Sequence, residues 1–153
     1  MKKWAIVLIG ALLLGSAWAD NELKRTPSAE GAAVGFSNVQ DGSVVPPVFT
    51  VRFSIAGMGV APAGMEIENT GHHHLLIDIE ELPNLDQPLP ATDQIIHFGK
   101  GQSETELQLS EGAHTLQLLL ADYRHIPHDP PVLSERITIT VETGAPEPVE
   151  PEK

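Results

Sequence analysis

The chain contains no cysteine, which excludes disulfide bonds, thiolate metal sites and a cysteine nucleophile. Aromatic residues make up only 5% of its 153 residues, too few to stack many nucleic-acid bases. Basic residues are also scarce, since 9 Lys and Arg stand against 21 Asp and Glu and give a net charge of -12. Phosphate groups would be repelled, so nucleic acid is not expected as a partner. The length allows one modest domain.

The first 19 residues have the pattern of a secretory signal peptide. Two lysines precede a short apolar run, and Ala17-Trp18-Ala19 places small residues at the two positions that signal peptidase recognises. We therefore predict a signal peptide over residues 1–19 and a mature protein that is periplasmic or secreted. The apolar run is too short to span a bilayer comfortably, so no stable membrane insertion is expected after cleavage.

The two ends of the predicted mature chain lack apolar periodicity. Residues 20–33 are polar and are expected to form a flexible lead-in. Residues 144–153 are rich in proline and glutamate, which predicts an extended, disordered tail because proline lacks a backbone donor and the carboxylates repel one another. Residues 34–143 remain for one folded domain, which is long enough to bury a hydrophobic core.

The residues of this domain alternate between apolar and polar. Four runs show the pattern most clearly: 48–55, 104–110, 113–120 and 136–142. A period of two indicates antiparallel strands with one buried face, and no stretch has a convincing helical period. The turn residues Ser110–Gly112 predict a hairpin that joins 105–109 to 113–120. About seven short strands in a domain of this size favour an all-β, immunoglobulin-like antiparallel β-sandwich.

All seven histidines lie between positions 72 and 128. His72-His73-His74 begins an apolar run that is predicted to be a strand. Because side chains alternate along a strand, His72 and His74 are expected to project outward together while His73 points inward. The Cα atoms of His72 and His74 would stand roughly 7 Å apart, so both imidazoles can converge on one metal ion.

Further imidazoles come from other parts of the chain. His97 ends a short apolar run, and His125 and His128 lie in a loop that is stiffened by prolines. The candidate metal ligands are therefore His72, His74, His97, His125 and His128. Neutral imidazole suits copper, zinc and nickel, and the nearby thioethers of Met58 and Met65 favour copper. We expect a copper ion as the cofactor, with zinc as the alternative.

Each of these assignments has a structural alternative. His73 and His114 continue the apolar faces of their strands, so we interpret both as hydrogen-bonded core histidines. Asp78 is interpreted as a solvated surface charge, and Met58 and Met65 as residues that pack in loops. The five candidate ligands could equally tie loops together by donating hydrogen bonds to backbone carbonyls.

Four segments that contain all seven histidines follow one another along the chain: Gly71–Asp78 (GHHHLLID), His97–Gln102 (HFGKGQ), Glu111–Leu118 (EGAHTLQL) and His125–Ser134 (HIPHDPPVLS). This series closely resembles the domain of unknown function 4399 family, over about Phe36 to Val141. The resemblance implies an exported single-domain protein, and it implies no particular function.

These observations favour an exported, periplasmic, histidine-rich metal-binding protein that acts as a copper carrier, chaperone or buffer. Its expected partners are a metal ion and another envelope protein. The alternative is a non-metal interaction or structural module of the cell envelope that binds another protein or a glycan. An enzyme is not expected, because the sequence lacks the Gly-x-Ser-x-Gly and His-Glu-x-x-His motifs.

Overall fold

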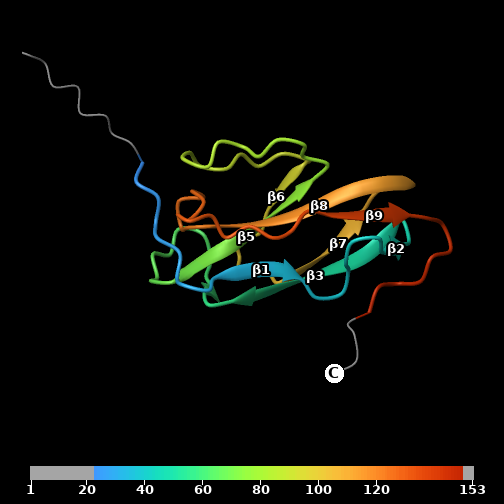
Figure 1. Cartoon of the computed structure of the whole chain (residues 1–153), viewed down its shortest axis with the longest axis horizontal. Helices are drawn as coiled ribbons and strands as arrows, with labels where there is room; N and C mark the ends of the chain where they lie inside the picture. Colours follow the sequence, from blue (N-terminus) through green and yellow to red (C-terminus); the bar gives the residue numbers. More distant parts are fainter. Residues whose placement is uncertain (1–22, 150–153) are drawn as a thin grey trace, which may run out of the picture.

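The computed structural model describes residues 23–149, and Figure 1 shows them as two layers of strands. This part of the chain contains nine strands and no helix, which confirms the predicted all-β fold. The two-layer arrangement is compatible with the immunoglobulin-like sandwich that the sequence favours. No helix within residues 23–149 is long and apolar enough to cross a membrane. The predicted signal peptide, residues 1–19, lies outside the described residues.

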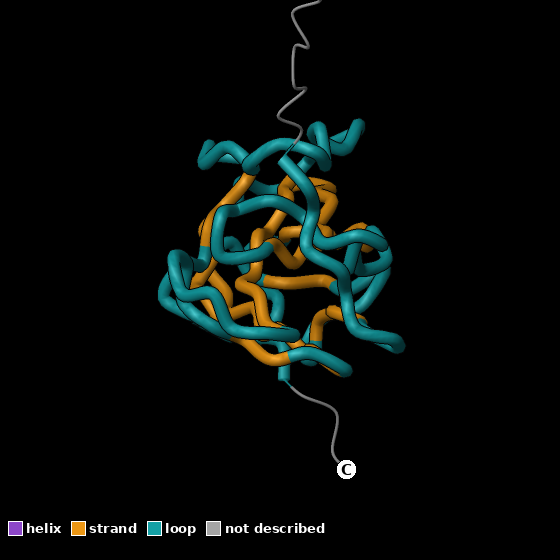
Figure 2. Tube along the Cα trace, turned by 90° about the vertical axis from the view of Figure 1, so that its left-hand side faces the viewer, coloured by secondary structure: helices purple, strands orange, loops and turns teal. Residues whose placement is uncertain are grey.

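The strands form a small sheet and a large sheet. The small sheet has the order β1-β3-β7: β1 (Ala33–Phe36), β3 (Val48–Ala56) and β7 (Glu104–Gln108). The large sheet has the order β2-β9-β8-β5-β4: β2 (Val44–Val45), β9 (Ile137–Val141), β8 (Gly112–Ala121), β5 (Thr70–Ile77) and β4 (Gly59–Val60). A sixth strand, β6 (Ile95–His97), also pairs with β5. Loops surround the strands, as Figure 2 shows.

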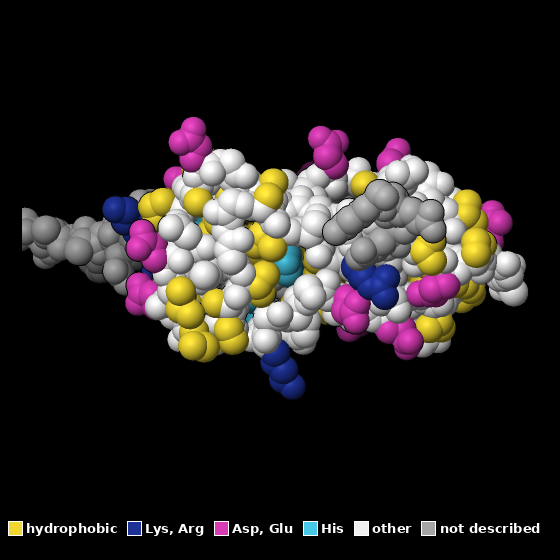
Figure 3. Space-filling model, turned by 90° about the horizontal axis from the view of Figure 1, so that it is seen from below, with side chains coloured by type: hydrophobic (Ala, Val, Ile, Leu, Met, Phe, Trp, Pro, Cys, Tyr) yellow, Lys and Arg dark blue, Asp and Glu magenta, His cyan; other side chains and the backbone are white. Residues whose placement is uncertain are grey.

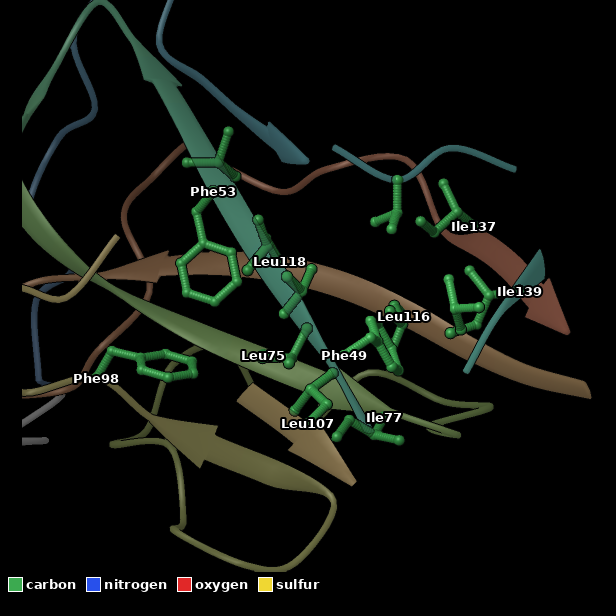
Figure 4. Packing of buried hydrophobic residues seen from close by; sticks show 14 of the residues in the cluster. Phe49, Phe53, Leu75, Ile77, Phe98, Leu107, Leu116, Leu118, Ile137 and Ile139 are labelled. Atoms are coloured by element: carbon green, nitrogen blue, oxygen red, sulfur yellow. The ribbon is translucent and has the colours of Figure 1, made fainter. Parts of the chain in front are cut away.

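The main hydrophobic core lies between the two sheets, and Figure 4 shows part of it. The small sheet contributes Phe49 and Phe53 from β3, and the large sheet contributes Leu75 from β5 and Leu118 from β8. These residues are the apolar members of alternating runs, because only one face of each strand is directed at the opposite sheet. Burial of each large side chain stabilises the fold by about 1.5–3 kcal/mol.

A second, smaller apolar cluster covers the other face of the large sheet. Leu76 of β5 packs there with Leu119 of β8 and with Leu89, which comes from the long loop between β5 and β6. The central strand β5 is therefore buried on both faces. His72 and His74 share the face of Leu76, which is directed away from the main core, as predicted. This outer face is covered, however, so both side chains are fully buried and do not reach the solvent.

The predicted hairpin between residues 105–109 and 113–120 is also wrong. Strand β7 pairs with β3, whereas β8 pairs with β5 and β9. The turn at Ser110–Gly112 therefore carries the chain from one sheet to the other. Leu107 and Leu116 contribute to the same core from opposite sheets, and this packing would be lost if the two strands paired side by side.

Hydrogen bonds attach both ends of the described chain to the domain. The flexibility expected of residues 20–33 and 144–153 stays a prediction, and residues 20–22 and 150–153 lie outside the described residues. In the lead-in, the amide of Ser28 donates to the carbonyl of Asp129 at 3.1 Å. In the tail, a carboxylate oxygen of Glu147 accepts from the amide of Thr50 on β3 at 2.6 Å. These segments pair with backbone groups of the domain that would otherwise have to be satisfied by water.

Candidate metal centre

Two neighbouring strands of the large sheet bring three imidazoles together. His72 and His74 lie on the same face of β5, and His97 of β6 is paired directly with His74. Directly opposed residues in antiparallel strands have Cβ atoms about 4.5–5.5 Å apart, so the third imidazole reaches the same face. One potential ligand atom from each of the three histidines lies within 4.8 Å of the other two. This geometry could hold a metal ion.

A fourth imidazole, that of His125, joins the three from the loop after β8. Its ring centroid lies 4.6 Å from that of His97, 5.0 Å from that of His72 and 6.1 Å from that of His74. The backbone of His125 has a φ of 69°, which is uncommon for a residue other than glycine. We refer to His72, His74, His97 and His125 as the histidine cluster.

A buried carboxylate shapes the loop that carries His125. The side chain of Asp122 is only 2% exposed, and it accepts hydrogen bonds from the Thr26 hydroxyl at 2.7 Å and from the amides of Arg124 and Ile126 at 2.8 and 3.1 Å. Burial alone would raise the pKa of Asp122, but the hydrogen bonds from Thr26, Arg124 and Ile126 lower it on balance. Asp122 is thus a charged anchor for the turn, and the sequence analysis did not identify it.

The three strand-borne imidazoles are held in the neutral form. Burial, followed by the neighbouring imidazoles His97 and His125, lowers the pKa of His72 to about 4. Burial, followed by His72 and His97, lowers the pKa of His74 to about 2. The pKa of His97 is lowered by burial and then by His125. At neutral pH these rings therefore keep a free nitrogen lone pair, which is what a metal ion requires.

The buried ring nitrogens of these histidines lack hydrogen-bond partners within the described part of the chain. This holds for both nitrogens of His72 and His74, and for Nε2 of His97. Buried polar atoms are nearly always hydrogen-bonded, and leaving one unpaired costs about 1–3 kcal/mol. A metal ion at the centre would satisfy one nitrogen of each ring, so the donor set fits a bound ion.

A glycine sets the position of the His97 ring. A Cβ atom added to Gly99 would lie 2.2 Å from Cε1 and 2.5 Å from Nε2 of His97, far inside any real contact. The imidazole therefore lies directly against the backbone of Gly99. The adjoining backbone is fixed as well, because Phe98 donates to the carbonyl of His73 at 3.0 Å and Gly99 accepts from Ala63 at 2.9 Å.

The structure does not bring His128, the fifth predicted ligand, to the cluster. A Cβ atom added to Gly71 would lie 2.9 Å from Nε2 of His128 and equally close to Leu120, which is a residue of the main core. Gly71 shares the inward face of β5 with Leu75, opposite to the face of His72. The sheet therefore separates His128 from the cluster. Burial lowers the pKa of His128, and the charge of Asp122 opposes this effect.

His73 points inward, as predicted, but its buried Nδ1 has no hydrogen-bond partner within the described residues, in contrast to the expected hydrogen-bonded core histidine. Its ring contacts that of Phe53 with centroids 5.1 Å apart, and burial lowers its pKa to about 4. Met58 and Met65, which the sequence analysis interprets as residues that pack in loops, have different surroundings, since Met58 packs against the main core and Met65 is 52% exposed.

His114 is a hydrogen-bonded structural histidine, as predicted. Its Nδ1 lies 2.7 Å from a carboxylate oxygen of Asp78, and its Nε2 lies 2.9 Å from the carbonyl oxygen of Ser110. Burial lowers the pKa of His114, but the hydrogen bonds to Asp78 and Ser110 raise it on balance. Asp78 is therefore a surface charge, as predicted, since its side chain is 41% exposed, but it is also paired with His114.

The neighbouring hydroxyl of Ser110 does not turn this pair into a catalytic triad. Its Oγ lies 3.4 Å from Nε2 of His114, but the shorter contact of that nitrogen is with the Ser110 carbonyl. A carbonyl can only accept, so Nε2 carries a proton. It cannot then act as the base that a serine nucleophile needs.

Comparison with known proteins places the chain in a family. The model of the family described as "Domain of unknown function (DUF4399)" matches residues 51–142. The match runs from within β3 to the end of β9 and includes all members of the histidine cluster. No curated protein and no solved structure matches the chain. Because the match covers more than half of its residues, the chain belongs to the DUF4399 family.

Proposed function

We propose that the protein is an exported metal-binding protein that acts as a copper carrier, chaperone or buffer. His72, His74 and His97 would hold the ion, and His125 would be the fourth ligand. One observation carries the proposal: three imidazoles from two paired strands place potential ligand atoms within 4.8 Å of one another, with buried nitrogens that lack other partners.

The donor set supports a transition metal. Calcium and magnesium prefer oxygen ligands, whereas the cluster offers only imidazole nitrogen. Among divalent ions that accept imidazole, copper generally binds more tightly than nickel or zinc. Copper is therefore the proposed ion and zinc its alternative.

The surroundings support the binding and exchange of a cation. Acidic side chains are spread over the face shown in Figure 3, where only a small area of histidine is visible. Negative potential raises the local concentration of cations and speeds their association. His72 and His74 are fully buried, whereas His97 and His125 are only partly buried, so an ion would enter beside the latter two.

A metal titration tests this proposal. Purified protein is titrated with Cu(II), Cu(I) and Zn(II) in the presence of competing chelators. We expect one ion to bind per chain with an affinity tighter than micromolar, and we expect the variant His74→Ala to lose this binding. The variant His114→Gln is the matched control, because it removes an imidazole outside the cluster. Absence of stoichiometric binding in the unmodified protein would contradict the proposal.

The export part of the proposal has a separate test. Cell fractionation of the full chain and of a variant without residues 1–19 should place the first in the periplasm or medium and the second in the cytoplasm. The mass of the exported protein should correspond to cleavage before Asp20. Retention of the full chain in the cytoplasm would contradict export and leave the metal proposal standing.

A further inference from the structure

We infer that His125 is a displaceable fourth ligand, and that the coordination position it leaves is where an external neutral nitrogen donor, such as the imidazole of an accepting protein, binds the metal. This inference rests on the proposed function, since it presupposes an ion held by the other three histidines. It adds a route by which the ion leaves a largely buried site.

The three strand-borne ligands have little freedom to move. Strand β5 pairs with β8 through His72 and His74, which lie opposite Ala121 and Leu119. Its other edge pairs with β6, where His97 lies opposite His74. His72 and His74 are fully buried, so movement of either ring away from the ion would disturb the packing on its face of β5. The ring of His97 lies directly against the backbone of Gly99, which restricts its movement as well.

His125 is attached differently. It lies outside the strands, in a short turn closed by hydrogen bonds from the amide of His125 to the carbonyl of Asp122 and from the amide of Asp122 to the carbonyl of Ile126, both at 2.9 Å. Its own carbonyl accepts from the amide of Leu89 at 2.8 Å. These bonds hold the backbone of the turn, so the imidazole can swing on its side-chain torsions without breaking a strand.

The ring of His125 stands beside the other three without joining their tight grouping. It is closer to His97 and His72 than to His74, at 4.6 and 5.0 Å against 6.1 Å between centroids. The ligand atoms that lie within 4.8 Å of one another come from the other three residues. Three imidazoles leave a four-coordinate ion with one further position, which a small rotation of His125 would fill or vacate.

The class of the external donor follows from the ligand that it replaces. A second imidazole forms the same kind of bond to the ion as His125 does, so the energy of the metal–nitrogen bond changes little on replacement and the exchange can run in either direction. It also brings no charge into a site where His72 and His74 are fully buried, and burial of a charge is costly. A transfer step needs both properties.

The backbone of His125 supports a functional reason for its position. A left-handed backbone at a residue other than glycine costs about 1 kcal/mol or more, and such residues cluster at sites where a side chain must be aimed. Here the backbone at a φ of 69° is kept by the hydrogen bonds that Asp122 accepts from the amides of Arg124 and Ile126. Asp122 is thus a positioning residue for the displaceable ligand.

The test compares His125→Ala with His74→Ala, with His114→Gln as the control. Each purified protein is loaded with Cu(II), and release to excess chelator is followed with and without added imidazole, while electron paramagnetic resonance reports the nitrogen ligands. We expect His125→Ala to bind one ion through the other three histidines and to release it faster by at least about 10-fold, the smallest loss seen when even a supporting contact of a metal site is removed. Added imidazole should slow this release and restore the nitrogen signature. His74→Ala should bind no ion, with or without imidazole.

Different failures contradict different claims. If the unmodified protein binds no Cu(II), the proposed function is wrong and the inference falls with it. If the unmodified protein binds Cu(II) but His125→Ala releases it at the unmodified rate, or ignores imidazole, His125 is not a ligand. If His125→Ala cannot bind Cu(II) at all and imidazole does not restore binding, His125 is an obligatory ligand rather than a displaceable one. In the last two cases the metal site stands and the inference is overturned.

Discussion

The two faces of β5 carry the same residue type in different surroundings. His73 points into the main core and contacts Phe53, whereas His72 and His74 point to the other face and meet His97 and His125. All three adjacent histidines are buried, and burial lowers the pKa of each. Burial and a lowered pKa therefore do not mark a ligand. The two faces differ because only the face of His72 and His74 brings further imidazoles close by.

The same substitution made on each face of β5 tests whether only one face binds the metal. We expect His74→Leu to weaken copper binding by more than about 100-fold, because it removes a ligand and not merely a supporting contact. We expect His73→Leu to leave the affinity almost unchanged, since leucine fills a similar space beside Phe53. Isothermal titration with Cu(II) measures both. Equal losses in the two variants would show that the two faces do not differ in function.

Two glycines allow a finer comparison of the faces. We expect Gly99→Ala to displace the ring of His97 and to weaken copper binding by about 10–100-fold, with little change in the fold. We expect Gly71→Ala to destabilise the apo protein instead, because its Cβ would lie 2.6 Å from the backbone carbonyl of Ala121. Titration and chemical unfolding of both variants check this. Unchanged affinity in Gly99→Ala would mean that the His97 ring need not lie where the structure places it.

We expect acid to destabilise the apo protein through the buried histidines on both faces of β5. The folded pKa of His72 and of His73 is about 4, below the value of about 6.5 in an unfolded chain. The unfolded state therefore binds protons first, so stability present above pH 6.5 is lost as the pH falls towards 4, and for His74 further towards 2. Between pH 7.5 and 5 each of the substitutions His73→Leu and His74→Leu should reduce this loss by about 1–2 kcal/mol. Denaturant unfolding without metal measures the loss, and a pH-independent free energy of unfolding would contradict it.

The smallest expected effect concerns His114, which does not lie on β5. Its contribution to stability changes with pH in the opposite direction to that of the β5 histidines. Its pKa is raised in the folded state, so the stability it contributes is fully present below pH 6.5 and is lost as the pH rises through the folded pKa. We expect His114→Gln to lower the free energy of unfolding by about 1 kcal/mol at pH 6 and by less at pH 9. Thermal unfolding at the two pH values measures the difference. A larger effect at pH 9 would contradict the assignment of a protonated His114 paired with Asp78.

The sequence predicted the parts of the site that depend on local periodicity. Alternation along β5 was sufficient to place His72 and His74 on one face and His73 on the other. The burial of the outer face was not predictable in this way, because it depends on the loop that covers the large sheet with Leu89. The prediction of a hairpin at Ser110–Gly112 was wrong for a related reason. A turn signal shows that the chain reverses, and it does not show which sheet the next strand joins.

The loop histidines show where sequence reasoning ends. His125 and His128 are three residues apart, yet the structure places them on opposite sides of the large sheet. Their spacing gives no sign of this, since it is set by the turn that Asp122 closes and by the return of the chain past Gly71. Asp122 itself left a weak signal. It is an aspartate directly after a long apolar strand, and its carboxylate accepts a hydrogen bond from the amide of Arg124, two residues later, which is the pattern of an Asx-turn.

X-ray absorption spectroscopy of the copper-loaded protein reports the atoms that surround the ion, so it shows whether the histidine cluster binds copper. We predict three or four nitrogen ligands at about 2.0 Å with the outer-shell scattering of imidazole rings, and we predict that this signature disappears in His74→Leu and persists in His73→Leu. A first shell of oxygen alone, or an imidazole signature that survives His74→Leu, would contradict this prediction.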